Sequence, residues 1–135
     1  MSIELVYLDD QEKEATLRVE KLEGADFDGL VTNRLWLNDR NLVGSTFRNA
    51  VLTGAFIYDS NAKDCNFEHA NLVSASFGNS DLENANFRNS RVFGSSFRGA
   101  NLKGADFRDC IGLSSAELAD ARFDSSTIWP EGFSP

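Results

Sequence analysis

Residues 65–109 read CNFEH ANLVS ASFGN SDLEN ANFRN SRVFG SSFRG ANLKG ADFRD, a run of pentapeptides without insertion or deletion. The same frame extends back to Ala15 and gives 19 units over 95 residues. With the middle residue of each unit numbered i, position i is large and apolar except at Thr32 and Ala62, and position i−2 is mostly small. Helices repeat every 3.6 residues and strands every two, so a period of five predicts a solenoid whose repeats bury their inner face by stacking.

A second period lies inside the first. Five aromatic i residues recur every twenty positions, namely Phe27, Phe47, Phe67, Phe87 and Phe107. Twenty residues are four pentapeptides, which predicts a coil with four sides and an inner ladder on each side, with rungs about 4.8 Å apart. Position i+2 is mostly Gly, Asn or Asp, the residues that tolerate the dihedral angles of tight turns, and we expect it at the corners. The 19 units then make just under five coils.

The units resemble the A(D/N)LXX consensus of the pentapeptide-repeat family, in particular its small cyanobacterial-type members. The resemblance covers about 70% of the chain, with matching units such as Ala85-Asn86-Phe87 and Ala105-Asp106-Phe107. It implies an all-β fold, a right-handed quadrilateral β-helix with i and i−2 inward and the other three positions outward. It implies no catalytic residue, because the family motif contains none.

The chain divides into three parts around the repeat. Residues 1–14 precede it, residues 15–109 form the β-helix, and residues 110–135 follow it. The first part contains a β-like segment, Ile3 to Leu8, and we expect it to cap the first coil, since an open β-helix end exposes unpaired backbone groups. The alternative is an arm that binds a partner.

The last part is expected to form a C-terminal cap, with the register breaking at Gly112. A capping box at 114–117 predicts a short helix near 114–120. The next residues look like one more unit, with Phe123 inward, and the tail resembles the ending of many cyanobacterial and plant pentapeptide proteins. We expect Trp129 and Phe133 to close the last coil.

The charge is concentrated at the ends of the chain. The net charge is −8, but residues 15–109 hold twelve acids and eleven bases, so the sides of the coil are nearly neutral. No basic stripe exists, which argues against direct nucleic-acid binding. Some members of this family inhibit DNA gyrase by imitating DNA, which requires a strongly anionic rod. The coil of this chain is nearly neutral, so a DNA-mimic inhibitor of an enzyme such as DNA gyrase is kept only as the alternative function.

Catalysis, cofactor binding and metal binding find no support in the sequence. The single histidine is at an outward corner, and a regular solenoid leaves no pocket in which acid and base groups could be positioned. The two cysteines, Cys65 and Cys110, occupy inward i−2 positions too far apart for a disulfide. No run is long enough for a membrane span and no secretory signal is evident, so we expect a cytoplasmic protein.

Large apolar residues at outward positions are the unusual feature. They fall on two neighbouring sides of the coil and should form one patch, consisting of Val31, Trp36, Val51, Phe56, Tyr58, Val73 and Phe93. Contiguous exposed apolar surface usually marks an interface; the other interpretation is that a terminal segment, Ile3 to Leu8, covers it. The sequence therefore predicts a non-catalytic protein-binding or scaffold module, whose partner is an unidentified protein or a second copy of the chain.

Overall fold

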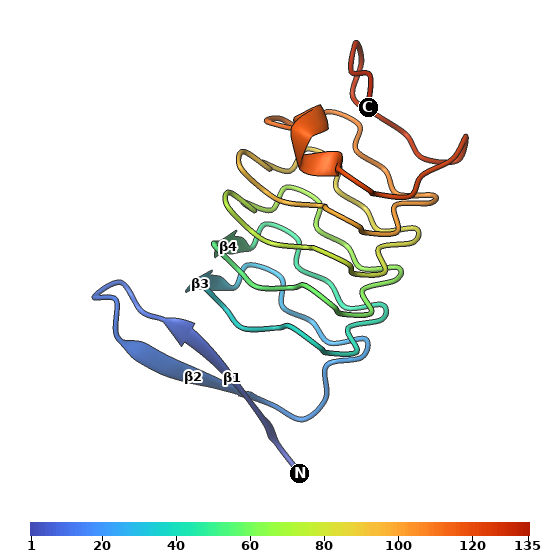
Figure 1. Ribbon diagram of the computed structural model, residues 1–135. Helices are drawn as coiled ribbons and strands as arrows, with labels where there is room; N and C mark the ends of the chain where they lie inside the picture. Colours follow the sequence, from blue (N-terminus) through green and yellow to red (C-terminus); the bar gives the residue numbers. More distant parts are fainter.

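The computed structural model describes residues 1–135, except the side chain of Ala116. The fold is all-β. Its named elements are β1 (Ile3–Leu8), β2 (Glu14–Val19), β3 (Val31–Asn33), β4 (Val51–Thr53) and a single turn of 3-10 helix, η1 (Ser115–Leu118). The remainder of the solenoid consists of short parallel bridges joined by turns (Figure 1).

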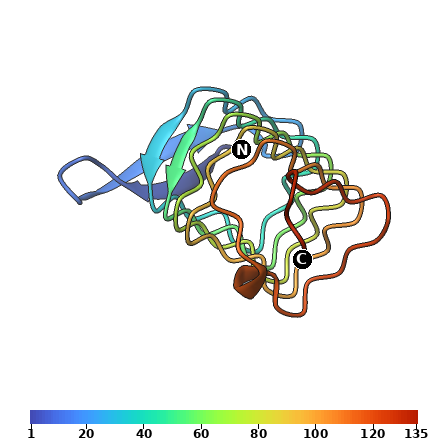
Figure 2. The ribbon, with the colours of Figure 1, turned by 90° about the horizontal axis from the view of Figure 1, so that it is seen from above.

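Each coil contains twenty residues. Parallel bridges join outward i−1 residues twenty apart, for example Thr46 with Asn66 and Asn66 with Asn86. Along the regular coils the N–H of the i residue donates to a carbonyl of the next coil, as Phe47 does to Asn66 at 2.7 Å. Seen from above, the coils follow similar outlines with rounded corners, each displaced somewhat from the one before (Figure 2). This register confirms the period of twenty.

Positions i and i−2 line the interior, as expected. Thr32 and Ala62, the two exceptions to the apolar pattern at i, are also buried. The phenylalanine ladder stacks with ring centroids 4.8–5.1 Å apart, in the pairs Phe27–Phe47, Phe47–Phe67, Phe67–Phe87 and Phe87–Phe107. A second ladder, Phe77 and Phe97, meets the first edge to face. The rings of both ladders are buried, and stacked and perpendicular arrangements are the ones that aromatic pairs favour.

The corners fall at i+2. Every i+2 residue from Gly24 to Asp109 has a positive φ, between 50° and 73°. Glycine and asparagine adopt this region readily, whereas Arg34 does so with strain (φ 50°). The abundance of Gly, Asn and Asp at this one position therefore follows from the backbone geometry of the turn.

The N-terminal end differs from the expected repeat. The unit centred on Leu17 lies in β2, which pairs antiparallel with β1, so that Leu17 faces Leu5 across a hairpin. From residue 14 to residue 19, polar and partly buried residues alternate, a period of two that suits a strand. The first parallel bridge of the coil is Asp26 with Thr46. Strand β1 also pairs with β3, giving the sheet order β2-β1-β3-β4.

The C-terminal end continues the stack with a shifted register. Ile111 still pairs twenty residues back with Arg91, but Arg122 pairs with Asn101 and Ile128 with Asp106. The extra residues follow Gly112, where the sequence predicts the break, and the segment containing η1 covers one side of the last coil. Trp129 stacks on Phe107 at 5.3 Å and extends the phenylalanine ladder.

Two C-terminal expectations require correction. The expected helix near 114–120 is only the 3-10 turn Ser115–Leu118. Phe123 was expected inward, but its side chain is 40% exposed, since none of the described residues forms a further coil over it; it packs edge-on against Trp129 at 5.2 Å. Among the residues that the structure describes, no helix has the length and apolar character to cross a membrane.

Candidate protein-interaction surface

The apolar patch begins on the side of the solenoid formed by β3 and β4. These strands pair in parallel, which brings Val31 of one coil directly beside Val51 of the next. The neighbouring inward residues, Thr32 and Leu52, are buried, so the two valines project from the opposite, outer face. Val31 is 70% exposed, the largest value for an apolar side chain other than the N-terminal methionine.

An aromatic cluster occupies the adjacent side. The rings of Trp36 and Phe56 stack at 5.7 Å with an interplanar angle of 9°, and Tyr58 meets Phe56 edge to face at 6.4 Å. All three side chains are partly buried. They contact one another on the outside of the coil, because the inward positions beneath them are filled by Leu37 and Ile57.

Val73 and Phe93 extend the patch toward the C-terminal end. They occupy equivalent positions on successive coils, and Phe93 is 47% exposed. The guanidinium of Arg91 lies 5.6 Å from the centre of the Phe93 ring, a cation–π contact. Gly112 lies against the same residue so closely that a Cβ there would be 2.6–2.7 Å from Phe93 atoms. The predicted residues therefore follow the corner between two sides over several coils.

The N-terminal hairpin does not cover this patch. Strand β1 joins β3 edge to edge, through Leu8 opposite Asn33 and through the N–H of Trp36, which donates to Val6. The hairpin thus extends the sheet at the N-terminal end of the solenoid, and its turn projects sideways from the stack of coils (Figures 1 and 2). The exposure of Val31 and Phe93 agrees with this arrangement.

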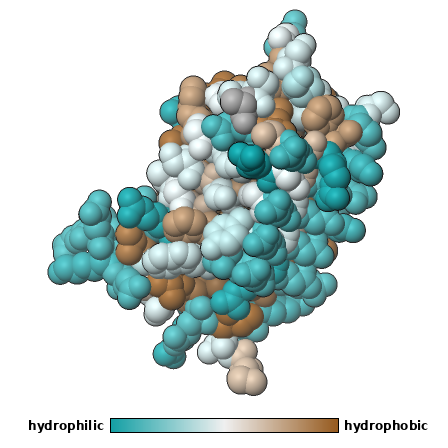
Figure 3. Space-filling view, viewed as in Figure 1, coloured by the Kyte–Doolittle hydropathy of each residue, from teal (hydrophilic) through white to brown (hydrophobic). Residues whose placement is uncertain are grey.

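A second group of exposed apolar residues lies at the C-terminal end and was not predicted from the sequence. Its members, each 40–47% exposed, are Ile111, Phe123 and Ile128. Figure 3 shows hydrophobic surface near the hairpin and again at the opposite end of the molecule. Ile111 continues the outward column of Val31 and Val51, a signal that the period of twenty already contained. Phe123 and Ile128 follow the register shift, so the period could not place them.

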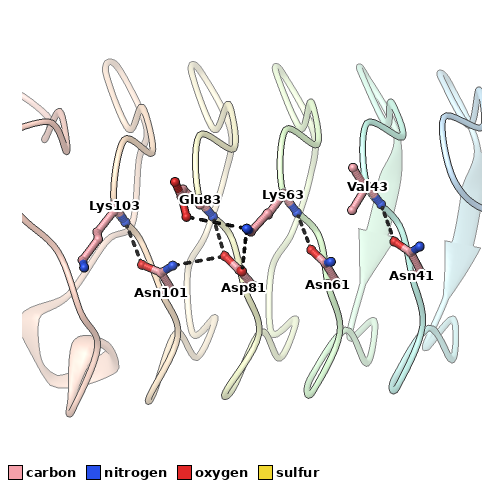
Figure 4. Close-up of polar contacts among 8 residues, drawn as sticks. All are labelled: Asn41, Val43, Asn61, Lys63, Asp81, Glu83, Asn101 and Lys103. Carbon is pink, nitrogen blue, oxygen red and sulfur yellow. Dashed lines mark hydrogen bonds and ion pairs between the residues drawn. The ribbon is translucent and has the colours of Figure 1, made fainter.

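The other two sides of the solenoid carry polar outward residues with a defined structural role. Figure 4 shows one of them, where Asn41, Asn61, Asp81 and Asn101 form a column. Each of these side chains accepts a hydrogen bond from the backbone N–H two residues later, at 3.2–3.3 Å. The adjacent side repeats the arrangement with Asp26, Asn66, Asn86 and Asp106. These Asx contacts supply an acceptor to an N–H that the coil leaves unpaired.

Several charges on the polar sides are paired, either across neighbouring coils or within a unit. Arg48 contacts Asp28 at 2.8 Å, and Arg108 contacts Asp106 at 2.7 Å. Burial alone would raise the pKa of Asp106, but hydrogen bonds from Arg108 outweigh it and hold that pKa below its ordinary value. The pKa of Asp28 is lowered in the same way, against burial, by hydrogen bonds from Thr46 and Arg48.

Both cysteines are free and buried, as expected from their positions. The thiol of Cys65 donates to the carbonyl of Leu42 at 3.0 Å. Burial raises the pKa of Cys65 to about 12 and that of Cys110 to about 11. Thiols in this state are chemically inert, so neither is a candidate nucleophile or redox site.

The surface also has shallow grooves. One, of about 320 Å³, lies between the hairpin and the corner of the coil, beside Arg34 and Gly54. Another, of about 360 Å³, lies beside Tyr58 and is lined by Gly78, Ser96 and Arg98. Within the part of the chain that the structure describes, no group of three or more His, Cys, Asp or Glu side chains is placed to hold a metal ion.

Comparison with solved structures finds similar chains among pentapeptide repeat proteins. A protein from the thylakoid lumen of Arabidopsis thaliana is 27% identical, over 72% of this chain and 70% of that one, with a TM-score of 0.39. A protein from the cyanobacterium Cyanothece is 17% identical, over 78% and 88%, with a TM-score of 0.38. QnrB1, a plasmid-mediated fluoroquinolone resistance protein, is 16% identical, over 78% and 84%, with a TM-score of 0.36.

No curated protein sequence matches the chain. The family profile described as the pentapeptide repeat region matches residues 40–111, more than half of the 135 residues. This match covers the coils with the most regular register and both polar sides. The chain therefore belongs to the pentapeptide-repeat family.

Proposed function

We propose that the protein is a non-catalytic protein-binding module whose contact surface is the apolar patch, and that its ligand is another protein. The observation that carries the proposal is the cluster of Trp36, Phe56 and Tyr58 on the outside of a coil whose interior is already filled. Tryptophan and tyrosine are enriched among the residues that dominate binding energy in protein interfaces. Val31 and Phe93 extend the same surface with exposed side chains.

The fold itself makes no demand for apolar residues at these positions. On the polar sides, the equivalent i−1 residues are Asn and Asp, which accept a backbone hydrogen bond. Trp36 and Phe56 have no acceptor and forgo this contact. A sequence that needed only a stable coil would gain by placing Asn or Asp there, which supports a role in binding.

A non-catalytic role is supported by the placement of the titratable groups. The groups with altered pKa values are buried thiols, carboxylates and guanidinium groups in surface pairs such as Asp106 and Arg108, and the exposed Asp124, whose pKa is lowered by hydrogen bonds from Ser126. None of these groups lines the groove beside the hairpin or the groove beside Tyr58. Catalytic acids and bases are usually found where a cleft and an altered pKa coincide.

The charge pattern favours this proposal over mimicry of DNA. Basic residues lie among the acids on the sides of the coil, where Lys63 approaches Asp81 at 3.6 Å and Arg48 neutralises Asp28. A DNA mimic would require a continuous row of negative charge. An absence of inhibition in a gyrase supercoiling assay is the expected result.

We propose that the solenoid is a right-handed coil of just under five turns with a cap at each end. Support for the handedness comes from the parallel bridges between successive coils, since crossover connections between parallel strands are right-handed in nearly all proteins. The hairpin β1–β2 and the segment from Gly112 onward are the proposed caps.

The test is capture of partners from a lysate of the native host. Wild type is compared with Phe56→Glu/Phe93→Glu and with a control of equal charge change on the polar side, Asn41→Glu/Asn61→Glu. We expect a specific protein to be retained by wild type and the control and lost by the patch variant. Equal retention by all three forms would overturn the proposal. Light scattering on the same samples identifies a second copy of the chain as the occupant only if self-association present in wild type and the control is lost in the patch variant.

A further inference from the structure

Strand β2 presents an unpaired edge at the N-terminal end of the solenoid. It is the terminal strand in the order β2-β1-β3-β4, and it pairs with β1 alone. In the view of Figure 1 it lies at the margin of the sheet farthest from β4. Edge strands commonly carry proline, a bulge or a row of like charges that prevents pairing with other chains. The six residues of β2, EATLRV, contain no proline and carry one acid and one base.

The hydrogen-bonding groups of β2 point outward at three residues. At the hairpin turn the N–H of Asp9 donates to the carbonyl of Lys13 at 2.9 Å, which identifies residues 9 and 13 as a hydrogen-bonded pair. Such pairs alternate along an antiparallel ladder, so the odd-numbered residues of β2 bond to β1. The N–H and C=O groups of Glu14, Thr16 and Arg18 therefore face the free edge.

The sequence of β2 is complementary to itself in one register. With Thr16 on a twofold axis, Glu14 faces Arg18 of the second copy on one face of the sheet, and this contact occurs twice. Arg18 already contacts Glu4 of its own chain at 3.0 Å, so in this register each Arg18 lies between two carboxylates. On the other face, Ala15 lies opposite Leu17 of the second copy. The three residues with outward backbone groups are those that form hydrogen-bonded pairs in this register.

The neighbouring registers lack this match. With Leu17 on the axis, Glu14 would face Glu20 of the second copy, and like charges directly opposite each other are destabilising. With Ala15 on the axis, Arg18 would face Glu12, which lies in the hairpin turn with a positive φ and outside the strand. Registers that differ by a half step bring together side chains from opposite faces.

We infer that two copies of the chain associate head to head through antiparallel pairing of β2 with β2, in the register centred on Thr16. The two sheets then join into one continuous sheet across the N-terminal ends, which buries both free edges. Residues Ala15 and Leu17 extend the apolar inner face of the hairpin across the junction. This surface is separate from the apolar patch, so the patch stays available to a different protein.

Complementary charge reversal tests the register. Glu14→Arg creates two Arg–Arg contacts in a homodimer, and Arg18→Glu creates two Glu–Glu contacts, so each variant alone should weaken the dimer by roughly tenfold or more. Mixed in equal amounts, the two variants restore both ion pairs, and the heterodimer should form with an affinity close to that of wild type. Analytical ultracentrifugation measures all four samples, and circular dichroism checks their folding.

A cysteine at the axis gives an independent readout. Cα atoms of a hydrogen-bonded antiparallel pair lie about 5.5 Å apart, within the range of a disulfide. Thr16→Cys should therefore oxidise to a covalent dimer, whereas Ser125→Cys, an exposed position at the far end, should not; the two native thiols are buried. The inference is overturned if wild type is monomeric at the highest soluble concentration, if mixing the charge variants restores nothing, or if both cysteine variants cross-link equally. The variant Phe56→Glu/Phe93→Glu should remain dimeric even where it loses the partner of the patch.

Discussion

The polar and apolar sides of the solenoid share one backbone but differ in what their outward residues do. On the polar sides, Asn61 and its equivalents accept a backbone hydrogen bond and belong to the structure of the turn. On the apolar sides, Phe56 occupies the same place in the repeat without an acceptor and packs instead against Trp36 and Tyr58. The interior is equally regular beneath both. Outward apolar residues are therefore the part of the sequence that the coil does not explain, and binding is the function we assign to them.

The largest effect is expected from breaking the interior that both kinds of side share. Phe67 is fully buried, stacks on Phe47 and Phe87, and meets Phe77 edge to face. Phe67→Ala should lower the free energy of unfolding by about 3–5 kcal/mol, because it leaves a cavity between rigid rungs. Urea denaturation measures the change. Phe56→Ala, the same substitution on the outer surface, is the matched control and should lower it by less than half as much; equal losses would contradict the division into inner and outer positions.

A smaller, pH-dependent effect on the free energy of unfolding is expected from a substitution on a polar side. The pKa of Asp106 is below its ordinary value in the folded protein, so this carboxylate stabilises the fold above its unfolded pKa, and the contribution is lost as pH falls through the folded pKa. Asp106→Asn should lower the free energy of unfolding by about 1 kcal/mol at neutral pH, where it removes a hydrogen-bonded ion pair. The difference from wild type should shrink when denaturation is repeated below pH 3.8, the ordinary value for this carboxyl. A difference independent of pH would indicate that the ion pair contributes nothing.

An increase in the free energy of unfolding is expected from a substitution at a buried position beneath the apolar side. Thr32 occupies an inward position, is 4% exposed, and its hydroxyl has no hydrogen-bond partner among the described residues. Thr32→Val keeps the shape and removes the unpaired hydroxyl, so the free energy of unfolding should rise by about 1 kcal/mol. Thermal unfolding followed by circular dichroism detects the shift. A lower midpoint in the variant would show that the hydroxyl has a partner after all.

The smallest effect distinguishes a structural from a binding role for the aromatic cluster. Phe56→Asn gives the N–H of Tyr58 the side-chain acceptor found on the polar sides, while it removes ring contacts with Trp36. The two changes should nearly cancel and alter the free energy of unfolding by less than about 1 kcal/mol. A loss comparable with that of Phe67→Ala would mean that the outer ring is needed for the fold.

The interior was predictable because its signal repeats. The buried phenylalanines form two series with a spacing of twenty residues, so the four-sided coil and the orientation of its residues followed from spacing alone. The ends were not, since a single strand or turn has no repeat to identify it. Leu17 fits the frame of five and also the alternation of a strand, and the second pattern prevails because β1 provides an antiparallel partner. Phe123 fits the frame as well but lies where the stack ends.

In the candidate site, too, the features that repeat could be predicted and the features that do not repeat could not. Trp36 and Phe56 could be placed together from the period, and their rings do stack. The absence of a covering segment could not be foreseen, because whether β1 crosses the patch or joins the edge of β3 depends on backbone pairing that the sequence of Ile3–Leu8 does not specify.

Site-specific photo-crosslinking tests the central claim most directly. A photoreactive phenylalanine analogue replaces Phe56 in one sample and Asn61, the matched outward residue of a polar side, in the other, and both are irradiated in lysate of the native host. The proposed function predicts a discrete protein adduct from position 56 and none from position 61. An adduct from position 61 alone, or the same adducts from both, would contradict the assignment of the apolar patch as the binding surface.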